Sequence, residues 1–146
     1  MKRFFLFLIF IMVLSAQTTG CGIAEEKSAT ENVVTSYFEA VKAKDFDKAL
    51  SFYSPKFFEV TPQDDWLEAL KTINAKLGDL QTYKLTSWKG NKQVGTAGSG
   101  TYYELRYEVT YSKYPAKEVF NIFKPSAGGE LKIQGHNINS IGLIKE

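Results

Sequence analysis

The segment 101–111 constrains the fold most, because apolar and polar residues alternate over its whole length. The residues on one side are Tyr103, Leu105, Tyr107, Val109 and Tyr111, and those on the other are Tyr102, Glu104, Arg106, Glu108 and Thr110. A period of two over eleven residues is typical of a strand with one face on a core and the other in water. The sequence therefore predicts a sheet whose apolar face must be covered by other elements.

Three more strands are expected around this one, at 80–89, 117–124 and 131–139. A glycine-rich connection over 90–100 has room for a short strand near Val94. Turns are expected near Tyr114-Pro115 and over 125–129, where proline and glycine concentrate. These short connections predict an antiparallel meander.

The first half of the chain carries helical patterns instead. We expect one helix to begin at Ser28, which forms a capping box with Glu31. A short second helix is expected after the N-cap Asp45, with Ser54-Pro55 ending it. A third helix is expected from Thr61-Pro62 to a closing Gly78. Helices followed by strands indicate an α+β fold, with N-terminal helices packed on a curved antiparallel sheet.

Residues 1–20 have the pattern of a signal peptide. Lys2 and Arg3 precede the apolar run FFLFLIFIMVL at 4–14, and small and polar residues follow it. A spanning helix needs about 18–20 apolar residues, so we expect export and cleavage rather than a permanent membrane helix. The other interpretation is an uncleaved N-terminal anchor. Residues 28–146 are expected to form a single domain.

The charge balance argues against a nucleic-acid partner. The chain has 18 basic and 16 acidic residues, and Lys2 and Arg3 leave with the signal peptide. The mature chain is therefore neutral and lacks the basic footprint of a nucleic-acid binder. Lys84, Lys89 and Lys92 are interpreted as a solvated surface.

Cys21 is the only cysteine, so it cannot belong to a disulfide within the chain. It follows Thr18-Thr19-Gly20, and this stretch resembles the lipobox of bacterial lipoprotein precursors. The resemblance implies a diacylglycerol on the Cys21 thiol, an acyl chain such as palmitate on its amine, and 21–27 as a lipidated, flexible tether. Thr18 stands where that motif usually has leucine. Cleavage by the general signal peptidase, giving a secreted soluble protein, is the alternative.

The element order resembles the nuclear transport factor two-like superfamily, which has a cystatin-like α+β fold. The resemblance rests on YFEAVKAKDFDKALSFYSPKF (37–57) and on ELKIQGHNI (130–138), and it covers 28–146. It implies an apolar pocket between helix and sheet. The residues that would line it are Tyr37, Phe38, Tyr53, Trp66, Leu105, Tyr107, Phe120 and Ile133. The competing interpretation is that these side chains fill one another's space as core.

Catalytic chemistry has little support in the sequence. His136 is the sole histidine, and the inward parity of Leu131 and Ile133 predicts that it is exposed or at a strand end. A bulge at Gly135 would reverse that parity. We interpret the carboxylates of Glu104 and Glu108 as surface charges. Asp64 and Asp65 are placed in the first turn of the third helix.

We therefore expect no catalytic residue, no metal site and no cofactor. Two functions remain. The first is a membrane-anchored, non-catalytic binding or interaction module of the cell envelope, with a small apolar ligand, an envelope protein or a second copy paired through the sheet as partner. The second is an isomerase- or dehydratase-like enzyme that uses the apolar pocket, a buried tyrosine and a carboxylate.

Overall fold

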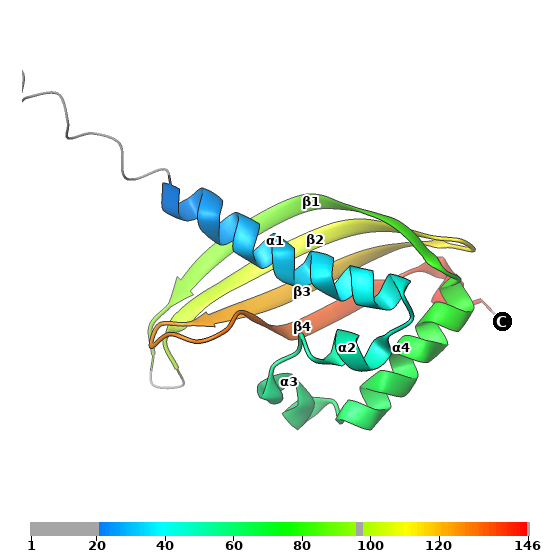
Figure 1. The fold of residues 1–146 in the computed structure, drawn as a ribbon, viewed down its shortest axis with the longest axis horizontal. Helices are drawn as coiled ribbons and strands as arrows, with labels where there is room; N and C mark the ends of the chain where they lie inside the picture. The colour runs from blue at the N-terminus through cyan, green and yellow to red at the C-terminus, as the bar shows by residue number, and fades with distance from the viewer. Residues whose placement is uncertain (1–20, 96–97, 146) are drawn as a thin grey trace, which may run out of the picture.

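The computed structural model describes residues 21–95 and 98–145 and has one four-stranded sheet with helices on one face (Figure 1). The helices are α1 (Cys21–Lys42), α2 (Phe46–Leu50), α3 (Pro55–Val60) and α4 (Gln63–Leu77). The strands are β1 (Leu80–Gln93), β2 (Gly100–Tyr111), β3 (Pro115–Pro125) and β4 (Lys132–Asn139), and the short 3-10 helix η1 (Ile141–Leu143) follows. The predicted α+β class is confirmed. The predicted signal peptide lies outside the described residues.

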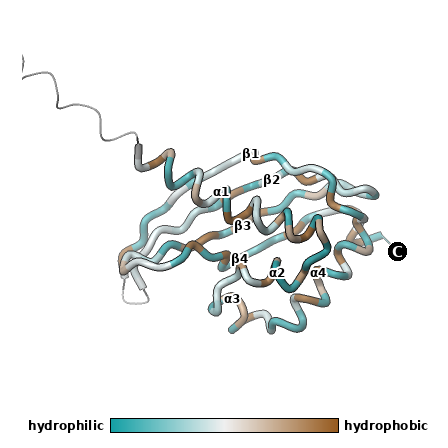
Figure 2. The backbone as a smooth tube through the Cα atoms, viewed as in Figure 1, coloured by the Kyte–Doolittle hydropathy of each residue, from teal (hydrophilic) through white to brown (hydrophobic). Residues whose placement is uncertain are grey.

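The sheet is the predicted antiparallel meander, in the order β1-β2-β3-β4. Strand β2 alternates as expected, with its five inward side chains, Tyr103 to Tyr111, almost fully buried. Strand β1 runs without a break to Gln93, so the short separate strand expected near Val94 is wrong. Apolar and polar residues are interspersed along the helices and strands (Figure 2).

Helix α1 begins at Cys21, so the predicted start at Ser28 is wrong. Glu31, the expected partner of Ser28 in a capping box, instead pairs with Lys27 one turn earlier. The Thr30 hydroxyl donates to the backbone carbonyls of Glu26 and Lys27, at 2.9 Å each, which places a regular turn before it. Residues 22–27 are thus helical where the sequence suggested a flexible tether.

The second predicted helix is confirmed, and its cap is confirmed too, because the Asp45 carboxylate accepts from the Lys48 amide at 3.1 Å. The predicted end at Ser54-Pro55 is wrong, because α2 already ends at Leu50 with Ser51 as its C-cap. The Ser54 hydroxyl caps α3, with Pro55 at its first position, and this helix was not predicted. The N-cap of α4 is Pro62, which has no side-chain capping bond, so the capping role expected of Thr61 is wrong. Gly78 closes α4 as predicted, with a φ of 88°.

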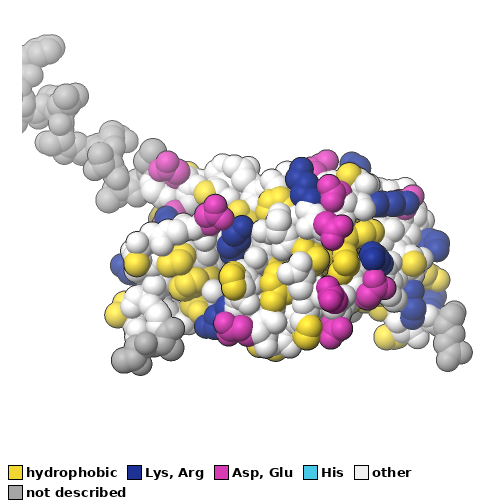
Figure 3. Space-filling view, turned by 60° about the horizontal axis from the view of Figure 1, so that its bottom comes forward, with side chains coloured by type: hydrophobic (Ala, Val, Ile, Leu, Met, Phe, Trp, Pro, Cys, Tyr) yellow, Lys and Arg dark blue, Asp and Glu magenta, His cyan; other side chains and the backbone are white. Residues whose placement is uncertain are grey.

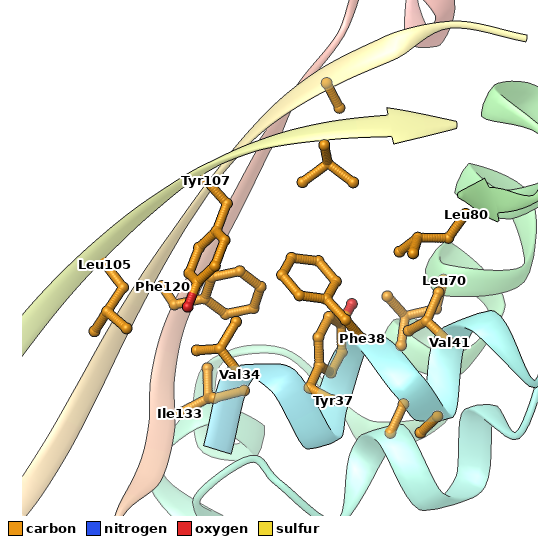
Figure 4. Close-up of a cluster of buried hydrophobic side chains, with 14 of the residues drawn as sticks. Val34, Tyr37, Phe38, Val41, Leu70, Leu80, Leu105, Tyr107, Phe120 and Ile133 are labelled. Atoms are coloured by element: carbon orange, nitrogen blue, oxygen red, sulfur yellow. The ribbon is translucent and has the colours of Figure 1, made fainter. Parts of the chain in front are cut away.

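The core lies between α1 and the inner face of the sheet (Figure 4). Val34, Tyr37, Phe38 and Val41 project from α1 and meet residues of β2, β3 and β4. Phe38 lies edge-on to both Tyr107 and Phe120, with ring centroids 5.3 and 5.4 Å apart. These contacts fix α1 along the sheet.

Candidate functional site

The eight side chains expected to line a pocket meet in one place. Seven of them are at most 4 % exposed, and the eighth, Trp66, is partly buried. Their rings are in contact: Tyr37 packs against Phe38, Tyr53 and Phe120 at centroid distances of 5.4 to 5.9 Å. Figure 4 labels six of the eight, Tyr37, Phe38, Leu105, Tyr107, Phe120 and Ile133, in the space between α1 and the sheet.

His136 lies inside this core, so the predicted exposed or strand-end position is wrong. Its side chain has 0 % exposure, and its ring stacks on Phe120 with centroids 4.1 Å apart. Figure 3 draws histidine in cyan and shows none on the face it presents. A local irregularity of β4 explains the error.

That irregularity is a β-bulge. Asn121 pairs with Gly135 and Ile122 pairs with Ile133, which leaves Gln134 as an extra residue. One extra residue reverses the alternation of a strand, so Ile133 and His136 both point inward. The bulge lies where the chain after α2 joins the edge of β4. There the Ile133 amide donates to the Phe52 carbonyl, and the Ser54 amide donates to the Ile133 carbonyl, at 2.9 Å each.

His136 is bonded to a buried carboxylate that the sequence analysis missed. Its Nε2 lies 2.9 Å from Oε2 of Glu118, whose side chain is also 0 % exposed. The other carboxylate oxygen accepts from the Tyr111 hydroxyl at 2.6 Å. The signal was present in the sequence, because Glu118 shares the parity of Phe120 and Ile122 in β3.

Tyr53 completes the group, with its hydroxyl 2.6 Å from His136 Nδ1. The donors and acceptors balance when the imidazole carries its proton on Nε2: Tyr53 donates to Nδ1, Nε2–H donates to the carboxylate, and Tyr111 donates to the second oxygen. We call Tyr53, His136, Glu118 and Tyr111 the buried polar chain. Both nitrogens and both carboxylate oxygens thus have partners within the protein.

Burial shapes the acid–base properties of these tyrosines. Burial raises the pKa of Tyr111, and the neighbouring Glu118 carboxylate raises it further. Burial likewise raises the pKa of Tyr53, and the nearby polar groups of Trp66 and Tyr37 partly offset that effect. For Tyr37 burial again dominates, with Tyr53 and Glu118 adding to it. These phenols stay neutral donors in the folded protein.

Tyr53 also lines a pocket on the molecular surface. A surface pocket of about 590 Å³ lies between α2, α3 and the start of α4. Its lining residues are Asp47, Leu50, Ser51, Tyr53, Pro55, Phe58, Glu59 and Gln63. Tyr53 is therefore the one member of the buried polar chain that this pocket touches.

The other candidate charges lie on the surface. Glu104 pairs with Arg106 at 2.8 Å, and Glu108 is exposed. Both carboxylates lie on the solvent-facing side of β2, as the sequence predicts. Asp64 and Asp65 occupy the first turn of α4. Within 21–95 and 98–145, no three histidine, cysteine, aspartate or glutamate side chains are grouped to hold a metal ion.

We expect Tyr111→Phe to lower the free energy of unfolding by about 1–3 kcal/mol, because it leaves a buried carboxylate oxygen without its donor. Tyr103→Phe is the matched control on the same strand and face, since the Tyr103 hydroxyl is buried without a partner among the described residues. That control should change stability by less than about 0.5 kcal/mol. Urea unfolding of both variants measures the difference, and equal losses would contradict the role of Tyr111.

The raised tyrosine pKa values predict loss of stability in alkali. The pKa values of Tyr37, Tyr53, Tyr107 and Tyr111 lie above the ordinary value of 10.0 in the folded state. Just above pH 10, these phenols therefore ionise only in the unfolded chain. Below that pH the free energy of unfolding is unaffected, and above it the free energy of unfolding falls by about 1.4 kcal/mol per pH unit for each phenol. Tyrosinate absorbance and near-ultraviolet circular dichroism, recorded together, should show these four ionising only as the fold is lost. Ionisation of all eight tyrosines with the dichroism intact would refute this.

Comparisons with known proteins identify the fold and no more. No protein-family model and no curated protein matches the sequence. A solved structure from Catenulispora acidiphila aligns with a TM-score of 0.54 at 9% identity, over 84% of this chain and 96% of that one. A Streptomyces avermitilis structure named as a "putative dehydratase from the NTF2-like family" aligns at 13% identity, over 79% of this chain and 95% of that one, with a TM-score of 0.47. Four helices on a four-stranded antiparallel sheet, an architecture shared with other solved proteins, is therefore the fold of this chain.

Proposed function

We propose that the protein is a lipoprotein of the cell envelope, anchored through Cys21, whose α+β domain is a non-catalytic binding or interaction module. One observation supports the non-catalytic part above all. The only histidine and its carboxylate partner have fully buried side chains, and their polar atoms are already bonded to Tyr53 and Tyr111. An acid–base pair needs access to a substrate, and this pair is used in holding the core together.

The anchor is supported by the sequence. The apolar run at 4–14 and the small residues before Cys21 fit export followed by lipidation. Among the described residues, no helix combines the length and apolar character needed to cross a bilayer. Two or more acyl chains on Cys21 would hold the domain firmly, since each buried methylene contributes about 0.8 kcal/mol.

An enzyme of the isomerase or dehydratase type is the second candidate, and Tyr53 favours it. This residue joins the imidazole of His136 to the pocket of about 590 Å³. A carboxylate, an imidazole and a phenol in series are groups that relay protons in acid–base catalysis. For such an enzyme, the pair must be reachable by small molecules from solution.

Chemical modification of the single histidine separates the two candidates. We expect diethyl pyrocarbonate to modify His136 much more slowly in the native protein than in urea, because the native ring is buried. Ethoxyformyl-histidine absorbance measures the rate, and N-acetylhistidine in the same buffers corrects for the effect of urea on the reagent. Equal rates in native and unfolded protein would support the enzyme and contradict a closed core.

Cys21→Ala tests the anchor. We expect the substitution to move the protein from the membrane fraction to the soluble fraction, because it removes the only thiol that can carry the lipid. Cys21→Ser is a second variant that keeps a small polar side chain and should behave alike. Mass spectrometry of the mature N-terminus gives the independent readout, since a Cys21 amine and thiol without added mass would refute lipidation.

A further inference from the structure

Helix α1 is fixed to the sheet close to its first turn. The Glu26 carboxylate lies 3.4 Å from the Lys124 ammonium at the end of β3. One turn later, the buried Thr30 hydroxyl accepts from the Trp88 indole N–H of β1 at 2.9 Å. The aromatic contacts of Tyr37 and Phe38 then continue along the helix. The helix therefore cannot swing independently of the sheet.

The proposed lipid site lies at the start of this fixed helix. Cys21 precedes Glu26 by five residues within α1, which corresponds to about 7.5 Å of helical rise. A flexible coil of the same length would let the domain rotate freely about the anchor. A helix instead keeps a fixed direction between the anchor and the domain. An anchor on Cys21 would thus determine which end of the domain meets the membrane.

The start of α1 lies beside one end of the sheet, where Gly100 of β2 pairs with Gln93 of β1 and with Pro125 of β3, next to Lys124. In Figure 1 this end of the sheet and the start of α1 lie toward the left, and the C-terminal residues lie at the right. Two large apolar side chains here are exposed: Ile23 in the first turn of α1, with 63 % exposure, and Val94 just after β1, with 82 %. Lys89 and Lys92, both exposed, precede Val94 at the end of β1.

We propose that the domain is held in one orientation on a phospholipid surface, with the start of α1 and Val94, which follows the end of β1, facing the headgroups. The inference rests on the proposed lipid anchor at Cys21. Val94, with Lys89 and Lys92 before it, suits the headgroup region, where hydrocarbon inserts and cations meet lipid phosphates. The β2–β3 hairpin and the C-terminal residues then face away from the membrane.

Depth-dependent quenching tests the orientation. Val94→Cys and Ile144→Cys are matched variants, because both replace exposed branched side chains (82 % and 78 %) at opposite ends of the domain. The introduced thiol is labelled with an environment-sensitive fluorophore in the lipidated full-length product. That protein is then placed in phosphatidylcholine–phosphatidylglycerol vesicles that contain lipid with a spin-labelled headgroup. We expect the probe at position 94 to lose most of its fluorescence and the probe at position 144 to keep most of it.

A linker variant tests the part played by the helix. Inserting about ten glycine and serine residues between Ala24 and Glu25 gives the anchor a flexible reach of about 17 Å. We expect the difference between the two probes to shrink, because the domain then tumbles on its tether.

The outcomes separate the two proposals. Equal quenching at positions 94 and 144, with the lipid mass present on Cys21, overturns the orientation and leaves the anchor intact. An unmodified Cys21 overturns the anchor and the orientation with it. A probe difference that survives the linker assigns the orientation to the hairpin surface alone and overturns the role of α1.

Discussion

The extra residue in β4 determines how the interior of this domain is built. Because Gln134 has no partner across the ladder, His136 turns inward onto Phe120 instead of outward into water. A buried imidazole needs partners for both nitrogens, and the neighbouring strand and the chain after α2 provide them. The same place in β4 also receives the backbone bonds that dock residues 52–54. One local departure from regular pairing thereby couples the helical layer to the sheet.

The buried polar chain is stable only as a whole. A carboxylate taken out of water loses its hydration, and removal of one partner from such a group is strongly destabilising. Here Glu118 meets a phenol on one oxygen and an imidazole on the other, so desolvation is offset by short hydrogen bonds. Such a network restricts the core to one arrangement, since sliding a strand would leave several groups unpaired at once. This structural role is sufficient to account for the burial of Glu118 and His136.

Periodicity predicted the layers well, because alternation and helical spacing report burial directly. The strand 101–111, the Asp45 cap and the closing Gly78 each depend on residues within a few positions of one another.

The position of His136 could not be predicted in the same way. Its direction depends on a bulge at the place where residues 52–54, about eighty positions earlier in the chain, dock on the strand. Glu118 was missed for a different reason. Alternation along β3 indicates that its side chain points inward, but burial of a charged residue is predicted only when its hydrogen-bond partners are known. The early start of α1 has a similar cause, since Glu26 and Thr30 are held by β3 and β1.

The aromatic core and the buried polar chain occupy the space between the helices and the sheet. The apolar side chains that a pocket would need are in contact with one another, and the polar side chains that catalysis would need are bonded to one another. A ligand would have to break those contacts, and the cost would weaken its binding.

The pocket beside Tyr53 differs, because it is bounded by short helices whose side chains are partly exposed. An occupant that touched Tyr53 would also act on the bond between Tyr53 and His136, so binding at the surface and order in the core would be coupled through one hydroxyl.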